Sequence, residues 1–327
     1  MPELVTADAA LAARIVESTY PIWNEGLTAE GYARWNALQL RTPWGLGHLR
    51  RVALVEGETI LASAKWYDFE AQLDGRPLRI LGIGAVFTPE SQRGTGHAPE
   101  LLRRMMAEAA RDGFHAAVLF SEIGAAYYER QGFVVIPRDT VTLEVIQKKG
   151  APATLVRAGD AADLKHLAAI HDAADRRARC SVRRTPELIQ FSITKRRTES
   201  ALAPLGRRTT EFYVSEEGNH AVAYVLLSRG PAGNLAAGPE TMWLEACGDR
   251  DPTGARVGAI LQVLLARTPS ETPPPLVSWL PDGWLPPQVR ITSRAPAADI
   301  MMIKALGSTV LPALEGKDVI WCHADHF

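Results

Sequence analysis

The chain has 327 residues, of which 46% are hydrophobic and 22% are charged, a profile that excludes a disordered chain and suggests about two folded domains. Its 36 Lys and Arg residues nearly balance its 37 Asp and Glu residues, so the formal net charge is −1. A chain with this charge balance lacks the broad positive electrostatic field that non-specific nucleic-acid binding requires. We therefore expect no nucleic-acid partner.

The N-terminal segment carries Glu3 and Asp8 in place of the basic and apolar regions of a targeting peptide. The longest unbroken apolar run, Ile80–Phe87, is too short to cross a membrane. The three cysteines are scattered, without the spacing of a disulfide framework or a zinc site. We therefore expect a cytoplasmic protein that holds no metal and binds no membrane.

Strand-like and helical patterns alternate over the first 146 residues. Gly57 separates two strand-like runs as the turn of a hairpin, and Gly113 stands where a helix C-terminal glycine belongs. The helices that we expect, in chain order, are Ala9–Trp23, Ala29–Leu40, His97–Arg111 and Ile123–Gln131. The strands that we expect are Arg51–Val55, Ile60–Tyr67, Arg79–Phe87, Ala116–Phe120 and a final pair within Phe133–Val145. Together they predict an α+β domain, a mixed sheet flanked by helices.

A polar segment with Gly and Pro, residues 147–153, has the composition of a linker, so we place a domain boundary there. Residues 154–327 then resemble a divergent second copy of residues 1–146. The hairpin pattern of the first domain recurs at 212–227, and its strand, glycine turn and long helix recur at 242–265. We expect two related α+β domains in tandem.

The stretch that says most about chemistry is Ile83–Ala98 (IGAVFTPESQRGTGHA), a strand followed by a glycine-rich turn and a helix. Unpaired N–H groups at a helix start attract anions, and glycines let the main chain approach a phosphate closely. A tight connection between a strand and a helix would explain the same glycines, so the pattern alone leaves both interpretations open. Neither GxxxxGK[ST] nor GxGxxG is present, which argues against a P-loop and against a dinucleotide fold.

The turn at 93–98 (RGTGHA) resembles the R/Q-x-x-G-x-G/A signature of the GNAT superfamily of acyl-CoA-dependent N-acetyltransferases. A second segment, Ser121–Phe133 (SEIGAAYYERQGF), follows in the order and at the distance typical of that superfamily. The resemblance covers residues 1–145. Within the superfamily, VFTPESQRGTG and LFSEIGAAYYERQGF are similar to the fungal-type lysine N6-acetyltransferase branch, and the layout is similar to that of tandem-GNAT aminoglycoside acetyltransferases.

The resemblance implies a GNAT-type mixed sheet with acetyl-CoA as co-substrate, and it assigns roles to residues of this sequence. The pantetheine arm would pair with the backbone of Ala85, Val86 and Phe87. The pyrophosphate would be held by Arg93, Gly94, Thr95, Gly96, His97 and Ala98. Tyr128 would lie beside the CoA sulfur and protonate the leaving thiolate. Ser121 stands where many members place an asparagine that contacts pantetheine.

An amine with a pKa near ~10.4 must lose a proton before it attacks, which costs about 4.6 kcal/mol at pH 7. Many GNAT proteins use a glutamate of the fourth strand for this, whereas residues 82–84 of this chain are Gly-Ile-Gly. The nearest carboxylates by sequence position are Asp68, Glu70 and Glu122, each of which has a solvated surface acid as its alternative interpretation. The base stays open at this stage, with a water chain as a further alternative.

The second domain has a counterpart of the phosphate turn at 249–255, where Asp249 and Asp251 oppose an anion. We therefore expect no cofactor site in residues 154–327. This divergent domain either shapes the acceptor cleft of the first or provides a structural or dimerisation surface, which leaves a homodimer open.

Our leading hypothesis is an acetyl-CoA-dependent N-acetyltransferase that acts on a primary amine of a small molecule, such as lysine or a related amine. The alternative is a non-catalytic acyl-CoA-binding regulatory module. The missing carboxylate at 82–84 favours this alternative, and the presence of Tyr128 disfavours it.

Overall fold

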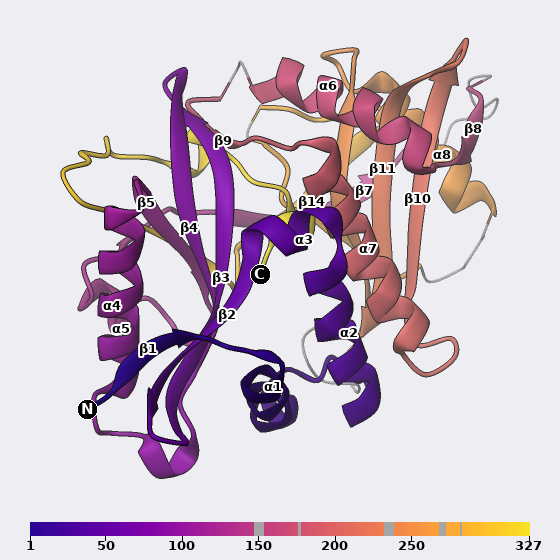
Figure 1. The fold of residues 1–327 in the computed structure, drawn as a ribbon. Helices are drawn as coiled ribbons and strands as arrows, with labels where there is room; N and C mark the ends of the chain where they lie inside the picture. The colour runs from indigo at the N-terminus through magenta and orange to yellow at the C-terminus, as the bar shows by residue number, and fades with distance from the viewer. Residues whose placement is uncertain (147–153, 176–177, 232–238, 268–272, 282) are drawn as a thin grey trace.

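The chain forms two mixed β-sheets flanked by helices, as Figure 1 shows, which confirms the expected α+β class with a second sheet after the first. The computed structural model describes residues 1–146, 154–175, 178–231, 239–267, 273–281 and 283–327. Within these residues, no helix is both long enough and apolar enough to span a membrane.

The first sheet is largely antiparallel, with a parallel pair, β4 and β5, near its middle. Its strands, from one edge to the other, are β1 (Glu3–Thr6), β2 (Leu49–Glu56), β3 (Thr59–Leu73), β4 (Arg76–Phe87), β5 (Ala116–Ser121), β15 (Ile300–Ala305) and β6 (Val134–Val135). Two short strands extend it at the far end of the β3–β4 hairpin: β9 (Cys180–Val182) pairs with β3, and β16 (Val319–Ile320) pairs with β9.

The second sheet has β12 and β13 as its parallel pair. Its strands, in order, are β14 (Val289–Pro296), β7 (Asp139–Val145), β13 (Leu276–Ser278), β12 (Glu240–Asp249), β11 (His220–Pro231), β10 (Thr209–Glu217) and β8 (Val156–Ala158). The β10–β11 hairpin and the strand β12 stand where the sequence pattern predicts them.

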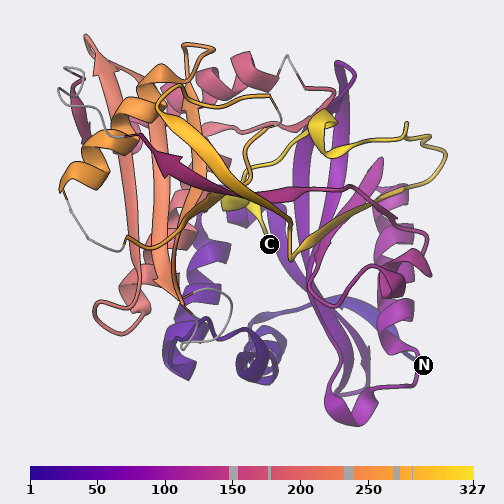
Figure 2. The ribbon, with the colours of Figure 1, turned by 180° about the vertical axis from the view of Figure 1, so that it is seen from behind.

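The two sheets exchange strands. The strand β15, from the C-terminal part of the chain, pairs with β5 and β6 in the first sheet, while β7 pairs with β13 and β14 in the second (Figure 2). The expected strand pair within Phe133–Val145 is therefore wrong, because β6 and β7 belong to different sheets. The apolar residues of β15, with Met301 and Met302 buried, take the place beside β5 that we expected a neighbouring segment to fill.

The expected linker, residues 147–153, lies outside the described residues, and the division of the chain into domains at that point stays a prediction. Strands from the two sides of this segment nevertheless share sheets. Each sheet is built from both parts of the chain, so neither part contains a complete sheet of its own.

Some of the helices begin where a capping side chain satisfies one of their first N–H groups. Asp8 accepts from the amide of Leu11 at 2.8 Å, and Thr28 accepts from Gly31 at 3.1 Å. The helices are α1 (Ala9–Trp23), α2 (Ala29–Arg41), α3 (Pro43–His48), α4 (His97–Arg111), α5 (Ala126–Glu129), α6 (Leu164–Asp175), α7 (Pro186–Leu202) and α8 (Ala255–Arg267). Short 3₁₀ turns cover Glu90–Gln92, Ala161–Asp163, Gly316–Asp318 and His323–Asp325.

The helix α4 packs on the first sheet through one apolar face. Leu101, Leu102, Met105 and Met106 of this face are buried against strand residues such as Leu81. Full burial of each such side chain contributes about 1.5–3 kcal/mol relative to exposure. This packing fixes the N-terminus of α4, and with it the glycine-rich turn, at one end of the sheet.

Candidate active site

The strands β4 and β5 separate at the point where the resemblance places the pantetheine arm. Their parallel pairing joins Ile80–Gly82 to Ala116–Val118, after which β5 continues in contact with β15. On its other side, β4 bulges against β3, because the register shifts between the pairs Ser63↔Phe87 and Lys65↔Gly84. The main chain of Ala85–Phe87 therefore runs past the end of its pairing with β5, in the position expected for a strand-like ligand to bind.

Ala85 lies at this bulge with a φ of 48°. A positive φ is unusual for a residue with a Cβ and costs about 1–3 kcal/mol, so the surrounding strands must hold it in place. Backbone strain of this kind is concentrated at bulges next to functional sites. The observed conformation thus marks the same segment that the sequence resemblance selects.

The glycine-rich turn presents main-chain donors to solvent. Gly94 and Gly96 have φ values of 79° and 84°, and a Cβ built at either position would meet no atom within 4 Å. Gly96 is the N-terminal cap residue of α4, and no side chain caps this helix. Arg93, Thr95, His97 and Ala98 lie around the same helix start, which leaves the first N–H groups of α4 facing open space as an anion site requires.

Tyr128 lies on the short helix α5, with 8% of its surface exposed. Its ring packs edge-on against Tyr127 at 4.9 Å between centroids and against Phe133 at 6.0 Å. It shares an apolar cluster with Leu81 and Ile83 of β4, on the strand that carries the bulge. Burial, aided by Tyr127 and Glu122, raises the pKa of the Tyr128 phenol to about 12, so the hydroxyl keeps its proton at neutral pH.

Ser121 ends strand β5 and is buried. Its hydroxyl donates to the carbonyl of Gly124 at 2.7 Å, which closes the turn that leads into α5. The hydroxyl is therefore engaged within the protein, and its contact with a cofactor stays a prediction.

Two of the three carboxylates considered as bases are held by arginines. Asp68 accepts from Arg79 at 2.5 and 2.9 Å, and Glu70 forms an ion pair with Arg183 at 2.9 Å. Both lie on β3 opposite the first half of β4, where the register pairs Asp68 with Leu81. They are structural ion pairs at a distance from the bulge. Glu122, in contrast, lines a cavity.

This cavity, which we call the acceptor cavity, has a volume of about 380 Å³ and is lined by residues of both sheets. Its walls come from the loop after α1, the end of β5, the helix α7, the strands β10 to β12, the residue before β15 and the C-terminal segment. Its charged and histidine residues are Glu25, Glu122, Arg196, Glu199, Arg208, Arg229, Glu245, Asp299, His323 and His326.

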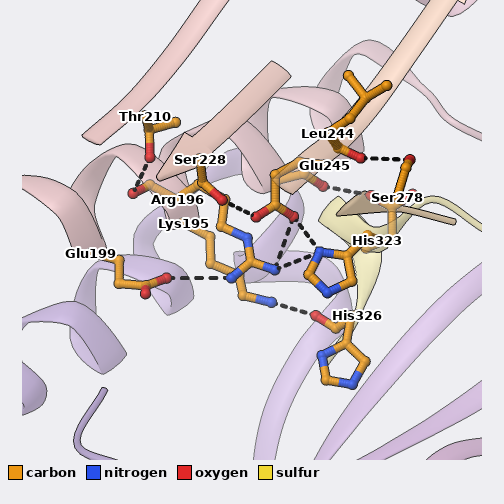
Figure 3. A network of polar contacts seen from close by, with 12 residues as sticks. Lys195, Arg196, Glu199, Thr210, Ser228, Leu244, Glu245, Ser278, His323 and His326 are labelled. Carbon is orange, nitrogen blue, oxygen red and sulfur yellow. Dashed lines mark hydrogen bonds and ion pairs between the residues drawn. The ribbon is translucent and has the colours of Figure 1, made fainter. Parts of the chain in front are cut away.

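A network of ion pairs forms one wall of the acceptor cavity (Figure 3). Arg196 lies between Glu199 at 3.4 Å and Glu245 at 3.1 Å, and His323 contacts Glu245 at 2.6 Å. Burial alone would raise the pKa of Glu245, but Arg196 and His323 hold it well below its usual range. Because these charges satisfy one another, this wall is a fixed surface.

Asp299 and Glu25 face the same cavity with carboxyl groups that titrate near neutrality. Burial, together with the charge of Glu122, raises the pKa of Asp299 to about 6. Burial and the neighbouring Glu199 raise the pKa of Glu25 to about 7, even though Arg208 lies 3.4 Å away. Both groups are thus poised to accept a proton.

The position of Asp299 follows from the exchanged strand. Ile300 pairs with Ser121, so Asp299, one residue before β15, lies beside the end of β5 and near Glu122. Its nearest basic neighbour is His326, with 3.5 Å between Nε2 and Oδ2. Sequence reasoning missed Asp299 because nothing in the local pattern shows that β15 joins the first sheet.

The C-terminal segment occupies the space that a fourth-strand glutamate would fill. A Cβ at Gly82 would lie 2.8 Å from the ring of Phe327, and one at Gly84 would lie 3.2 Å from the carbonyl carbon of Phe327. The ring also packs against Tyr67 at 4.7 Å between centroids. The glycines at 82 and 84 are therefore explained by packing, and a base has to come from another element.

The second sheet has no open helix N-terminus at the counterpart turn. The Asp249 carboxylate accepts from the amides of Arg256 at 2.8 Å and Val257 at 3.3 Å, and it pairs with the Arg256 guanidinium at 3.2 Å. A carboxylate thus fills the place where an anion would bind at the start of α8. The expectation that residues 154–327 have no cofactor site stays a prediction.

Within the described residues, no group of three or more His, Cys, Asp or Glu side chains is arranged to hold a metal ion. The three cysteines are free thiols.

The splayed strands, the glycine-rich turn and the buried tyrosine all lie within the part of the chain that matches a known family. Residues 18–136 match the family model described as the acetyltransferase (GNAT) domain. No curated protein matches the chain. Residues 18–136 thus match a GNAT-type acetyltransferase domain, the class that the sequence resemblance implies.

Solved structures share the whole two-sheet fold. A probable N-acyltransferase from Enterococcus faecalis V583 aligns with a TM-score of 0.66 and 14% identity over 94% of this chain and 73% of that one. A GCN5-related N-acetyltransferase from Kribbella flavida aligns with a TM-score of 0.62 and 15% identity over 93% and 72%. Eis1 from Mycobacterium abscessus gives a TM-score of 0.56 and 14% identity over 93% and 74%. At these identities the likeness establishes the fold.

Proposed function

We propose that the protein transfers an acetyl group from acetyl-CoA to the primary amine of a small cationic molecule. The observation that carries the proposal is the divergence of β4 from β5 after Gly82, beside the buried Tyr128 and the acid-lined acceptor cavity. A donor entering between the strands and an acceptor entering from the cavity would meet at this point.

The residues present fit coenzyme A. The open space in front of Gly94 and Gly96 and the uncapped start of α4 suit a diphosphate, with Arg93 adding positive charge. The side of Ala85–Phe87 that faces β5 lies beyond the β4–β5 pairing and suits the amide groups of pantetheine. When bound, acetyl-CoA supplies the activated acyl group.

Tyr128 and Asp299 divide the proton transfers between them. The Tyr128 hydroxyl, which stays protonated at neutral pH, donates to the departing thiolate. Asp299, with a pKa of about 6, is ionised at pH 7 and accepts the proton of the incoming ammonium, directly or through water. Glu122 lies next to it and strengthens its basicity by like-charge repulsion.

The acceptor cavity favours a positively charged substrate such as lysine or a related amine. Its arginines Arg196 and Arg208 are neutralised by Glu199 and Glu245, whereas Glu122 and Asp299 have no arginine or lysine partner among the described residues. A cationic amine would supply the missing counter-charge at that end. This agrees with the similarity of the motifs to the lysine N6-acetyltransferase branch.

The second sheet contributes Trp243 and Glu245 to the acceptor cavity, which favours a role in shaping the acceptor cleft over a purely structural one. Trp243 stacks on His323 at 3.8 Å between ring centroids and so fixes the cavity wall. A homodimer stays an open prediction.

Release of free thiol from acetyl-CoA across a panel of amines tests the proposal. Lysine and diamines should support turnover, and Nε-acetyllysine, which lacks the free side-chain amine, should support less. Binding of CoA by calorimetry without transfer to any amine would instead identify the protein as an acyl-CoA-binding regulatory module.

A further inference from the structure

A second cavity, which we call the rear cavity, has a volume of about 790 Å³, larger than the acceptor cavity. Its walls come from residues 137–141, the helix α6, the strand β12, the loop after β13 and residues 315–322. The acetyl transfer proposed above uses none of these residues, apart from Glu245, which lines both cavities. A cavity of this size accommodates a drug-sized organic molecule.

Arg138 lines the rear cavity without a carboxylate partner among the described residues. One guanidinium nitrogen donates to the carbonyl of Trp321 at 2.7 Å, and another contacts the sulfur of Met301 at 3.7 Å. One face of the guanidinium lies over the ring of Trp279 at 4.3 Å. Burial lowers the pKa of Arg138 to about 10, which is the response of a guanidinium whose charge no nearby anion balances.

The acids around the rear cavity already have basic partners. Asp139 pairs with Arg294 at 3.8 Å, Glu315 with Lys317 at 2.7 Å, and Asp249 with Arg256 at 3.2 Å. The charge on Arg138 is therefore left for a ligand to balance, and a single guanidinium fork matches one carboxylate in bidentate fashion.

Part of the remaining wall of the rear cavity is apolar. Trp279, Trp284 and Trp321 line the cavity together with Ile170 and Ala174. The indole N–H groups of all three tryptophans donate within the protein, at 3.2, 3.1 and 3.4 Å, so a ligand does not have to satisfy them. Such walls suit a planar ring system.

We propose that the rear cavity binds a small-molecule carboxylate with a planar aromatic body, the carboxylate on Arg138 and the rings among the tryptophans. This ligand is distinct from the cationic acceptor amine, because its charge is opposite. Residues 321 and 322 line the rear cavity while His323 and His326 line the acceptor cavity, so one short segment touches both sites.

Calorimetric titration of the full chain with 2-naphthoate tests this site, with the neutral 2-naphthalenemethanol as the matched ligand. Loss of the charged hydrogen bond in Arg138→Gln should weaken naphthoate binding roughly ten- to hundredfold. Ala174→Trp fills the cavity from α6, leaves Arg138 in place and should abolish binding. Arg290→Gln is the control. It removes an exposed arginine of β14 that pairs with Glu144 of β7, and the variant should bind naphthoate as the wild type does.

One naphthoate per chain, with weak binding of the alcohol, supports the proposal. No naphthoate binding to the wild type, equal affinity for the alcohol, or undiminished binding by Ala174→Trp would overturn it. If Arg138→Gln fails to fold, as thermal unfolding would show, the alcohol and Ala174→Trp still decide the question.

Discussion

Tyr128 combines two properties that suit a proton donor: it is buried in an apolar cluster, and its pKa is raised to about 12. Tyr128→Phe keeps the ring and its packing but removes the proton. We expect kcat to fall by roughly 10²-fold or more, with CoA affinity changed little, as measured by thiol release and calorimetry. Tyr127→Phe, on the same helix, is the control and should stay near wild-type activity; equal activity of the two variants would remove the role from Tyr128.

Asp299 sets the expected pH dependence. A base must be ionised to act, so turnover should fall about tenfold per pH unit below the raised pKa of about 6. Asp299→Asn should lower kcat strongly and abolish this acid limb. The groups around it are Glu122, which raises its pKa, and His326, whose own pKa is held well below its usual value by burial.

Glu122→Gln separates Asp299 from its neighbour. Removing the negative charge of Glu122 should lower the pKa of Asp299, so the acid limb of the pH–rate profile should move to lower pH while kcat at pH 8 changes little. A limb that stays in place in both variants would assign the titration to another group, with Glu25 as the next candidate.

The candidate site residues whose positions in the fold could be predicted from the sequence are those that depend on local geometry. Gly94, Gly96 and Tyr128 lie within short, regular segments, and the structure places the glycines just before α4 and Tyr128 on α5, while their roles stay predictions. Asp299 and Glu25 could not be predicted, because burial and a distant strand pairing give them their raised pKa values. Asp68 and Glu70 were plausible by proximity in sequence, but arginine partners hold them.

At the scale of elements, β4 depends on the C-terminal segment that packs over it. Gly82→Ala would place a methyl group 2.8 Å from the rings of Phe69 and Phe327, so we expect a loss of about 1–3 kcal/mol in the free energy of unfolding, measured with urea. Gly47→Ala on α3 is the control, because a Cβ there meets no atom within 4 Å, and it should leave stability unchanged or slightly raised. Equal stability of both variants would show that the segment does not press on β4.

Element boundaries were predictable for α1, where the Asp8 cap and the apolar periodicity agree, and for α4, whose apolar periodicity is strong. The helix expected over Ile123–Gln131 is reduced to Ala126–Glu129, because Ser121 and Gly124 form a turn before it. The partners of β6 and β7 were not predictable. A short apolar strand fits any apolar edge of matching register, and its sequence does not specify which one it joins.

At the scale of the whole molecule, the strand exchange makes the two sheets interdependent. A fragment of residues 1–146 lacks β15, so it would expose the apolar edge of β5 and leave β7 without its partners. We expect this fragment to be unfolded or aggregated by circular dichroism and limited proteolysis, and to be rescued by co-expression with residues 154–327. Cooperative unfolding of the fragment alone would contradict this interdependence.

The exchange also explains why the acceptor cavity could not be predicted. Its walls come from α7, the second sheet and the C-terminal segment, which approach the first sheet only in the folded chain. The sequence pattern predicts the α+β fold class and the glycine-rich turn before α4. The acceptor cavity depends on how the two sheets are joined, which the pattern does not show.

The central claim is that main-chain donors at the start of α4 hold the diphosphate of coenzyme A. Calorimetric titration of CoA into the wild type and Gly96→Glu tests it most directly, because the glutamate would place bulk and negative charge in the open space before the helix. Gly113→Glu is the control, at the other end of the same helix, with a φ of 80° and similarly open space. We predict that the wild type and Gly113→Glu bind CoA while Gly96→Glu does not; undiminished binding by Gly96→Glu would contradict the account.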